Sequence, residues 1–130
     1  MSPTPDDHDP LLDPSVDPDA EPEPLDPTLF EMQASFCRTM GHPHRLMILY
    51  LLKERELCVG DLAERIGVSQ PSISQHLSAM RGVGMVTMRR QGQFVYYRLA
   101  DESISQACEM VRGILTRRVH ERSAMLGGNG

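Results

Sequence analysis

The chain has 130 residues, room for one small domain, and a formal net charge of −5. It has no apolar run near the ~20 residues that cross a bilayer, and its N-terminus lacks the basic and apolar regions of a signal peptide, so we expect a cytoplasmic protein without a membrane partner. Three scattered cysteines with no C-x-x-C pair exclude a disulfide framework.

Residues 1–27 are predicted to be a disordered acidic tail rich in Pro and Asp. They hold eight of the ten prolines and nine of the 18 acidic residues, with no Lys or Arg. Such a segment buries too little apolar surface to offset the entropy of ordering. Residues 28–130 then carry 13 basic and nine acidic side chains, or +4. This excess favours a nucleic-acid partner, although charge runs are usually only solvated surface.

Two scaffold helices are predicted directly after the tail. Thr28 and Glu31 have the spacing of a capping box, so the folded domain is expected to begin at residue 28 and its first helix to run to about Met40. Gly41 ends that helix, and Pro43 suits the first turn of the next. The second helix has a broad apolar face, formed by Leu46, Ile48, Leu49 and Leu52.

Residues 59–80 are typical of a helix-turn-helix. Apolar residues recur at one-face helical spacing over residues 59–66, and Gly67 follows, where a left-handed residue costs least. Ser69 can cap a second helix, and Pro71 is tolerated in its first turn. This helix has a narrow apolar seam, formed by Ile73, Leu77 and Met80. Its remaining residues are small or polar and suit a major groove about 12 Å wide, so we expect a recognition helix.

A basic β-hairpin and a long helix are predicted to complete the domain. Residues 85–90 and 93–99 are rich in β-branched and aromatic residues and flank Gln91-Gly92, which indicates a hairpin. A last helix is expected from about Glu102 to Met125, followed by a frayed end at residues 127–130. The predicted fold is therefore mainly α with a small β-hairpin, a winged helix-turn-helix over residues 28–126.

The first and last helices carry apolar stripes that the core of so small a domain cannot bury. The stripes consist of Leu29, Met32, Phe36 and Met40 on the first helix, and Ile104, Cys108, Val111 and Leu115 on the last. A second subunit would cover both. We therefore expect a homodimer built through these helices, with two recognition helices about one DNA turn apart.

Contacts with double-stranded DNA are expected from the recognition helix and the hairpin. Gln can pair bidentately with adenine, whereas Ser and His discriminate less, so part of the specificity is expected to depend on DNA shape. Arginines on the wing and at the helix end would bind phosphates or enter the minor groove. The predicted DNA-binding residues are Ser69, Gln70, Ser72, Gln75, His76, Arg81, Arg89, Arg90, Gln91 and Gln93. Any one of these residues is explained equally well as solvent-exposed surface. The complete pattern of a polar helix face and a basic hairpin favours DNA binding.

Three segments together resemble the ArsR/SmtB winged-helix repressors of bacteria over about residues 30–120. They are MGHPHRLMIL at 40–49, ELCVGDLAERIGVSQPSISQHL at 56–77 and RRQGQFVYYRL at 89–99. The resemblance implies a dimer joined through its first and last helices, repression at an operator near its own gene, and release when an inducer binds.

The inducer sites of that family are only partly matched. Members that sense arsenite or soft metals carry ELCVCDL, whereas this chain has ELCVGDL, with Cys58 at the first thiolate and Gly60 at the second. One thiolate cannot hold a soft ion tightly, so Cys37, Cys108 or a tail group would have to complete the site. The family's zinc site on the last helix is expected to be absent. Asp101 matches its first ligand, but the other positions hold Ser103, Ile114 and Arg117.

The cysteines can either sense or pack. Cys58 is expected at the start of a helix, where a thiol pKa falls, but a buried free cysteine also behaves as a small hydrophobe. Cys37 and Cys108 lie on or beside the apolar stripes, which favours packing. If the two helices pack together, these thiols could come within disulfide or polysulfide reach. Members of the family that sense persulfide usually have a cysteine where Tyr50 stands, which argues against persulfide sensing by Cys37 and Cys108.

The histidines are interpreted as polar surface. His42 and His44 form a His-x-His with Cys37 five residues earlier, a spacing that a zinc site can use. A helix start commonly carries such polar residues, so that interpretation is favoured. His120 is expected at an exposed helix end.

The leading hypothesis is a homodimeric DNA-binding repressor that leaves its operator when its thiols bind arsenite or another soft metal ion, or are oxidised or persulfidated. The alternative is a winged-helix adaptor whose acidic tail binds a protein partner. An enzyme is not expected, because the chain has no phosphate-cradling loop, no suitable carboxylate pair and no nucleophile with a base at a recognisable spacing.

Overall fold

The computed structural model describes residues 17–20 and 24–127. The predicted disordered tail, residues 1–27, falls mostly on residues 1–16 and 21–23, which lie outside the described residues. The predicted frayed end, residues 127–130, falls outside them at residues 128–130 and is wrong at Gly127, which is the last residue of a helix. Residues 17–20 form a turn in which the Asp17 carbonyl oxygen accepts from the Ala20 N–H, 3.1 Å away.

Helix α1 spans Pro27–Met40, and α2 spans Pro43–Leu52. The predicted capping box at Thr28 is wrong. Asp26 is the N-cap residue, and its Oδ1 accepts from the Thr28 N–H at 3.0 Å. Pro27, with no N–H of its own and φ preset for a helix, takes the first helical position, so the cap falls two residues before Thr28. Helix α1 ends at Met40 and Pro43 opens α2, both as predicted.

The helix-turn-helix consists of α3, Val59–Ile66, and α4, Gln70–Gly82. Gly67 ends α3 in the left-handed conformation, with φ of 85°, and its N–H donates to the Ala63 carbonyl oxygen. Ser69 caps α4, because its Oγ accepts from the Ser72 N–H at 3.2 Å. Both predicted signals are confirmed, and they fix the direction in which α4 leaves the turn.

A three-stranded antiparallel sheet supports the wing. Strands β2, Val86–Gln91, and β3, Phe94–Leu99, form the predicted hairpin. Its two-residue turn is Gly92-Gln93, one residue later than the predicted Gln91-Gly92, because Gln91 pairs with Phe94. Gly92 has φ of 61°, as tight hairpin turns require. Strand β1, Leu57–Cys58, pairs with β3 and gives the order β1-β3-β2. The sequence did not predict β1, because two residues show no alternation.

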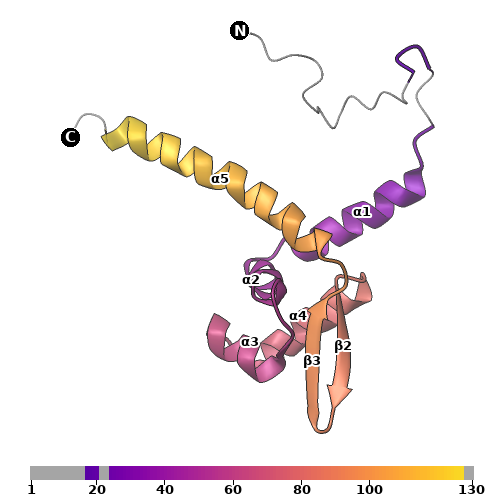
Figure 1. Cartoon of the computed structure of the whole chain (residues 1–130), viewed down its shortest axis with the longest axis vertical. Helices are drawn as coiled ribbons and strands as arrows, with labels where there is room; N and C mark the ends of the chain where they lie inside the picture. Colours follow the sequence, from indigo (N-terminus) through magenta and orange to yellow (C-terminus); the bar gives the residue numbers. More distant parts are fainter. Residues whose placement is uncertain (1–16, 21–23, 128–130) are drawn as a thin grey trace.

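The core lies between α2, α3, α4 and the sheet (Figure 1). Its buried side chains are Ile48, Leu49, Leu52, Leu57, Leu62, Ala63, Ile73, Leu77, Met80, Met85 and Val86. Phe36 and Met40 of α1 reach only the edge of this cluster. The three helices and the sheet therefore bury one another, and α1 adds little to the core.

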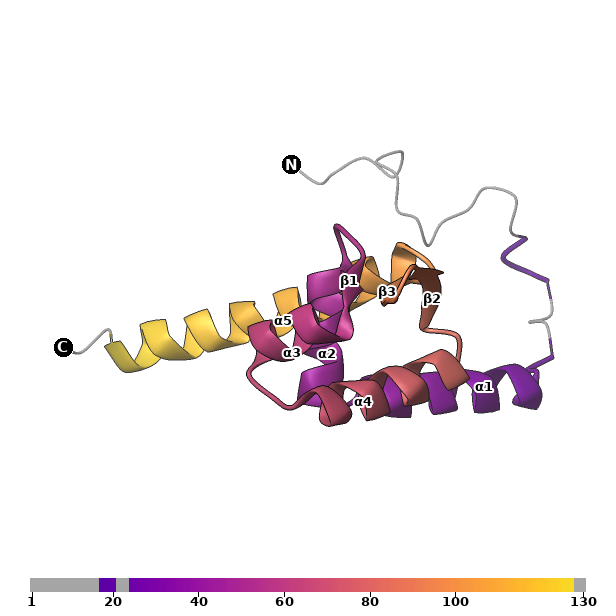
Figure 2. The same ribbon diagram turned by 90° about the horizontal axis from the view of Figure 1, so that it is seen from below.

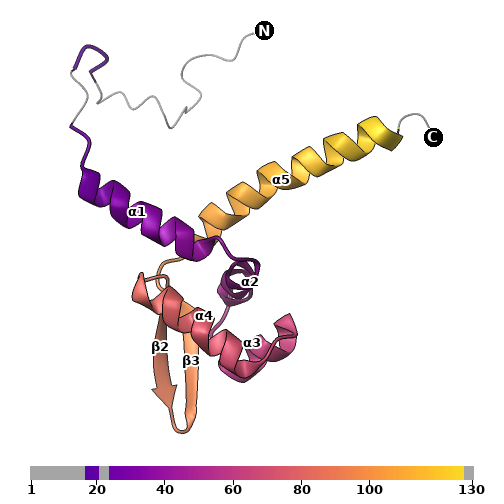
Figure 3. The same ribbon diagram turned by 180° about the vertical axis from the view of Figure 1, so that it is seen from behind.

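Helix α5 spans Ser103–Gly127, and Figures 1 and 3 show that it extends away from the core at an angle to α1. Seen from below, α5 runs out to one side while α1 lies near α4 (Figure 2). Only the first turns of α5 pack on the core, through Ile104 and Cys108. Within residues 17–20 and 24–127, no helix combines the length and apolar character that a membrane crossing needs.

Candidate nucleic-acid interface

Helix α4 has one buried face and one exposed polar face. Ile73, Leu77 and Met80 are buried against α2, α3 and the sheet. The exposed polar residues of the helix include Gln70, Ser74, Gln75 and Ser78. The helix therefore presents hydrogen-bonding groups of small bulk to solvent, as an element that enters a DNA groove must.

The structure places most of the predicted DNA-binding residues on the surface. The exposed ones are Ser69, Gln70, Gln75, Arg81, Arg89, Arg90, Gln91 and Gln93, whereas Ser72 and His76 are half-buried. Ser74 and Ser78 lie on the exposed part of α4 but were not among the predicted contacts. Each directly follows a residue of the apolar seam, Ile73 or Leu77, and this position in the sequence indicated that they lie off the buried face.

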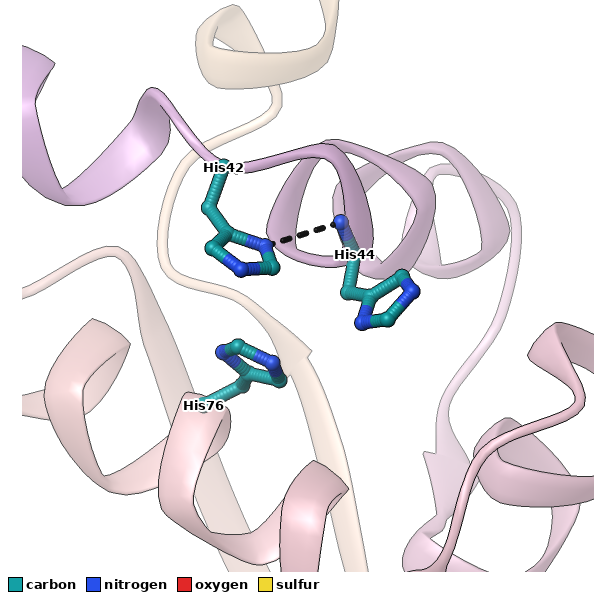
Figure 4. Close-up of side chains that lie close together, drawn as sticks. All are labelled: His42, His44 and His76. Carbon is teal, nitrogen blue, oxygen red and sulfur yellow. Dashed lines mark hydrogen bonds between the residues drawn. The ribbon is translucent and has the colours of Figure 1, made fainter.

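His76 points toward α2 and away from the open face of α4. Its Nδ1 accepts from Arg45 Nε at 3.1 Å, and its ring centroid lies 4.5 Å from that of His42 (Figure 4). Arg45 also donates from Nη1 to the Thr39 carbonyl oxygen at 3.1 Å. The geometry assigns His76 to the contact between α2 and α4, although the sequence had placed it among the DNA contacts.

Acidification is expected to destabilise the fold through His76. Burial, with the neighbouring His42, Arg45 and His44, lowers the pKa of His76 below its ordinary 6.5. Between the lowered pKa and 6.5 the unfolded chain binds more protons than the folded chain. The contribution of His76 to the free energy of unfolding is therefore fully present above pH 6.5 and is lost as the pH falls from 6.5 to the lowered pKa. Urea titrations with chelator present, about one pH unit either side of 6.5, should show a smaller decline for His76→Gln. Equal declines would contradict the assignment.

The wing is basic, and one of its arginines is held to the sheet. Arg89 forms an ion pair with Glu56, donates from Nη1 to Gln91 Oε1 at 2.7 Å and lies 4.9 Å from the Tyr96 ring centroid. Arg90, the next residue, points to the other face of the strand and is exposed. Arg90 is therefore better placed than Arg89 to meet a phosphate.

A further arginine of the hairpin, Arg98 on β3, was missing from the sequence prediction. It is exposed, and its Nε donates to Thr87 Oγ1 on β2 at 3.2 Å. The pairing of Thr87 with Arg98 across the strands depends on the hairpin register. In the sequence, only its position between Tyr97 and Leu99 indicated that Arg98 faces outward, because side chains alternate faces along a strand.

Cys58 lies at the N-cap of α3, as predicted, but its side chain makes no capping hydrogen bond. Its Sγ donates to Asp61 Oδ2 at 3.3 Å. At Gly60, an added Cβ would lie 3.7 Å from Gln70 Nε2, an ordinary van der Waals distance. A Cβ at position 60 therefore fits without displacing Gln70.

The other two cysteines are on separate helices. Cys108 of α5 contacts Met40 Sδ at 3.6 Å, and burial raises the pKa of its thiol, which keeps it protonated. Cys37 is exposed on α1. No cysteine belongs to a group of three potential metal ligands in the part of the chain that the structure describes.

Asp101 is engaged in starting α5. Its Oδ1 accepts from the Ser103 N–H at 2.8 Å, and this hydrogen bond lowers the pKa of the carboxyl group. The carboxylate is thus used at the helix start, where a negative charge is also favoured by the helix dipole.

Helix α4 with its exposed polar face, the turn at Gly67 before it and the basic β2–β3 hairpin together define a winged helix-turn-helix DNA-binding protein. Residues 42–88 match the model of the bacterial regulatory protein arsR family. The chain is 36% identical over 107 residues to the HTH-type transcriptional regulator Rv0081 of Mycobacterium tuberculosis, covering 82% of this chain and 90% of the relative. The crystal structure of Rv0081 superimposes with a TM-score of 0.67 at 35% identity, covering 77% of this chain and all of that one. The chain belongs to the arsR family.

Two further relatives carry informative descriptions. The biofilm growth-associated repressor of Xylella fastidiosa is 37% identical over 83 residues, covering 64% of this chain and 70% of the relative. The homodimeric winged helix-turn-helix domain of Mb0332 from Mycobacterium bovis has a TM-score of 0.67 at 28% identity, covering 72% of this chain and 87% of that one. The relatives are transcriptional regulators, not enzymes, in line with the expectation from the sequence.

Proposed function

We propose that the protein is a homodimeric repressor that binds operator DNA near its own gene and is released when a thiol-reactive inducer modifies it. The observation that carries the DNA-binding part is the exposed polar face of α4 beside the basic β2–β3 hairpin. The names of the Xylella and Mycobacterium bovis relatives, a repressor and a homodimer, support repression and dimerisation.

The dimer is expected to form through α1 and α5. Leu29 and Met32 of α1 are 60% and 64% exposed, and Val111 and Leu115 of α5 are 58% and 54% exposed. Large apolar side chains exposed along two helices are typical of a surface that a partner covers.

Sedimentation velocity at micromolar concentration should therefore show a dimer. Leu115→Glu should shift the protein toward monomer, because it buries a charge in the interface without touching the core. Gln106→Glu, an exposed change off the apolar stripe of the same helix, serves as the control. A parent protein that sediments as monomer alone would overturn the dimer.

Cys58 is the thiol best placed to receive the inducer. It starts α3, the first helix of the helix-turn-helix, so a change at this thiol acts directly on the element that positions α4. Cys108 is less suited, because burial raises the pKa of its thiol. A group added to Cys58 would meet Asp61 and disturb the start of α3.

Fluorescence anisotropy with the DNA upstream of the gene tests this proposal. The reduced protein should bind, and arsenite or an organic polysulfide should release it. Cys58→Ser should bind DNA but resist release, because serine is a good N-cap and preserves α3. Cys37→Ser and Cys108→Ser are the matched controls and should still respond to the polysulfide, which needs one thiol only. Loss of the arsenite response in either of them identifies the second thiolate, because one thiolate cannot hold a soft ion tightly. Release that persists in Cys58→Ser would show that Cys58 is not the sensor; an absence of release by either agent would remove the thiol inducer.

A further inference from the structure

Three histidines from two separate helices converge at one point (Figure 4). His42 caps α2, His44 lies in its first turn, and His76 comes from the middle of α4. One ring nitrogen of each lies within 4.8 Å of a ring nitrogen of the other two, and all three side chains are half-buried. Among the described residues, this is the one group of three potential metal ligands.

We propose that His42, His44 and His76 bind a divalent transition-metal ion of the zinc class, and that the ion links the start of α2 to the recognition helix. This inference does not depend on the thiol chemistry proposed above. Three imidazoles suit Zn²⁺, Co²⁺, Ni²⁺ or Cu²⁺, with a water completing the shell. Hard cations such as Mg²⁺ and Ca²⁺ prefer oxygen and are not favoured by three nitrogen ligands.

The rings need only a small adjustment to bind. At a Zn–N distance of about 2.0 Å in tetrahedral geometry, ligand nitrogens lie roughly 3.3 Å apart. The observed spacing, up to 4.8 Å, can close by rotation of the side chains, because none is locked in the core.

The hydrogen bonds at the cluster show what the ion must displace. His42 Nδ1 accepts from the His44 N–H, and His76 Nδ1 accepts from Arg45 Nε, both at 3.1 Å. A neutral imidazole has one lone pair. If the ion takes Nδ1 it replaces the hydrogen bond directly, and if it takes Nε2 the proton moves to Nδ1 and the bond is lost as well.

Metal binding therefore exchanges one connection between α2 and α4 for another. The Arg45–His76 hydrogen bond breaks, and Arg45 keeps its contact with the Thr39 carbonyl oxygen. The guanidinium charge also opposes a cation so close by. Arg45 is thus expected to weaken metal binding, and its removal to strengthen it.

Isothermal titration of the full chain with ZnCl₂ tests the site, with Cys37, Cys58 and Cys108 all changed to Ser so that no thiol contributes. One ion should bind per chain, and Co²⁺ should give the visible absorption of a four-coordinate site. His44→Gln and His76→Gln should each weaken Zn²⁺ binding about tenfold or more. His120→Gln, at an exposed site on α5, should leave the affinity unchanged.

A second variant and a second readout separate lost ligands from lost fold. Arg45→Gln should bind Zn²⁺ more tightly than the parent, which no unfolded protein would do. Saturating Zn²⁺ should raise the melting temperature of the parent and of His120→Gln, but not that of His76→Gln. Absence of Zn²⁺ binding by the parent, or equal affinity in the histidine variants and the control, would overturn the proposal. Both results are independent of DNA binding, so they leave the proposed repressor function untouched.

Discussion

Replacing Leu77 with alanine is expected to lower the free energy of unfolding by about 2–5 kcal/mol. Leu77 is fully buried on the inner face of α4, where that helix meets the core. The substitution removes apolar contacts and leaves a cavity that the surrounding helices fill only in part. Urea denaturation followed by circular dichroism measures the change.

The control for this prediction is Leu126→Ala. Leu126 is 76% exposed at the end of α5, and the same substitution there should change stability by no more than about 0.5 kcal/mol. Equal losses for the two variants would mean that α4 is not anchored by the core described above.

Replacing Gln75 with alanine is expected to weaken operator binding about 10- to 100-fold, the loss of one bidentate base contact. Gln75 is exposed on α4, in the second turn after the Ser69 cap, where recognition helices contact base edges. Binding to DNA of unrelated sequence should not change, because it depends on phosphate contacts. Fluorescence anisotropy with the two DNAs, each at several salt concentrations, separates these effects.

Arg90→Ala gives the contrasting result. A phosphate contact contributes to all DNA, so its loss should weaken operator and unrelated DNA alike and reduce the salt slope by about one. If Gln75→Ala instead weakens both DNAs equally, α4 does not read the sequence through this residue.

The local signals in the sequence were enough to place the helix-turn-helix. Gly67 ends α3 with a positive φ, and Ser69 caps α4 by accepting from the N–H of Ser72. Both signals depend only on residues a few positions away in the sequence. The start of α1 was misplaced because two adjacent signals competed. Pro27 at the first helical position outweighed the capping box, since a residue that lacks an N–H fits best where no N–H is bonded.

Features that depend on distant residues were not predictable in the same way. Strand β1 has two residues and exists only because β3, nearly 40 residues later, offers it a partner. The inward direction of His76 had a partial signal, since position 76 is three residues after Ile73 and flanks the buried seam. Its partners Arg45 and His42 lie more than 30 residues away, and no local pattern shows that they meet it.

The attachment of β1 to β3 has a consequence for how DNA is read. The hairpin is not a free arm, because β1 pairs with β3, and because Arg89 of β2 forms an ion pair with Glu56, the residue before β1. The distance between the hairpin tip and α4 is therefore set by the protein. Any mismatch with the spacing of the grooves has to be taken up by bending or twisting of the duplex, so base steps that deform easily are preferred even where no side chain touches them.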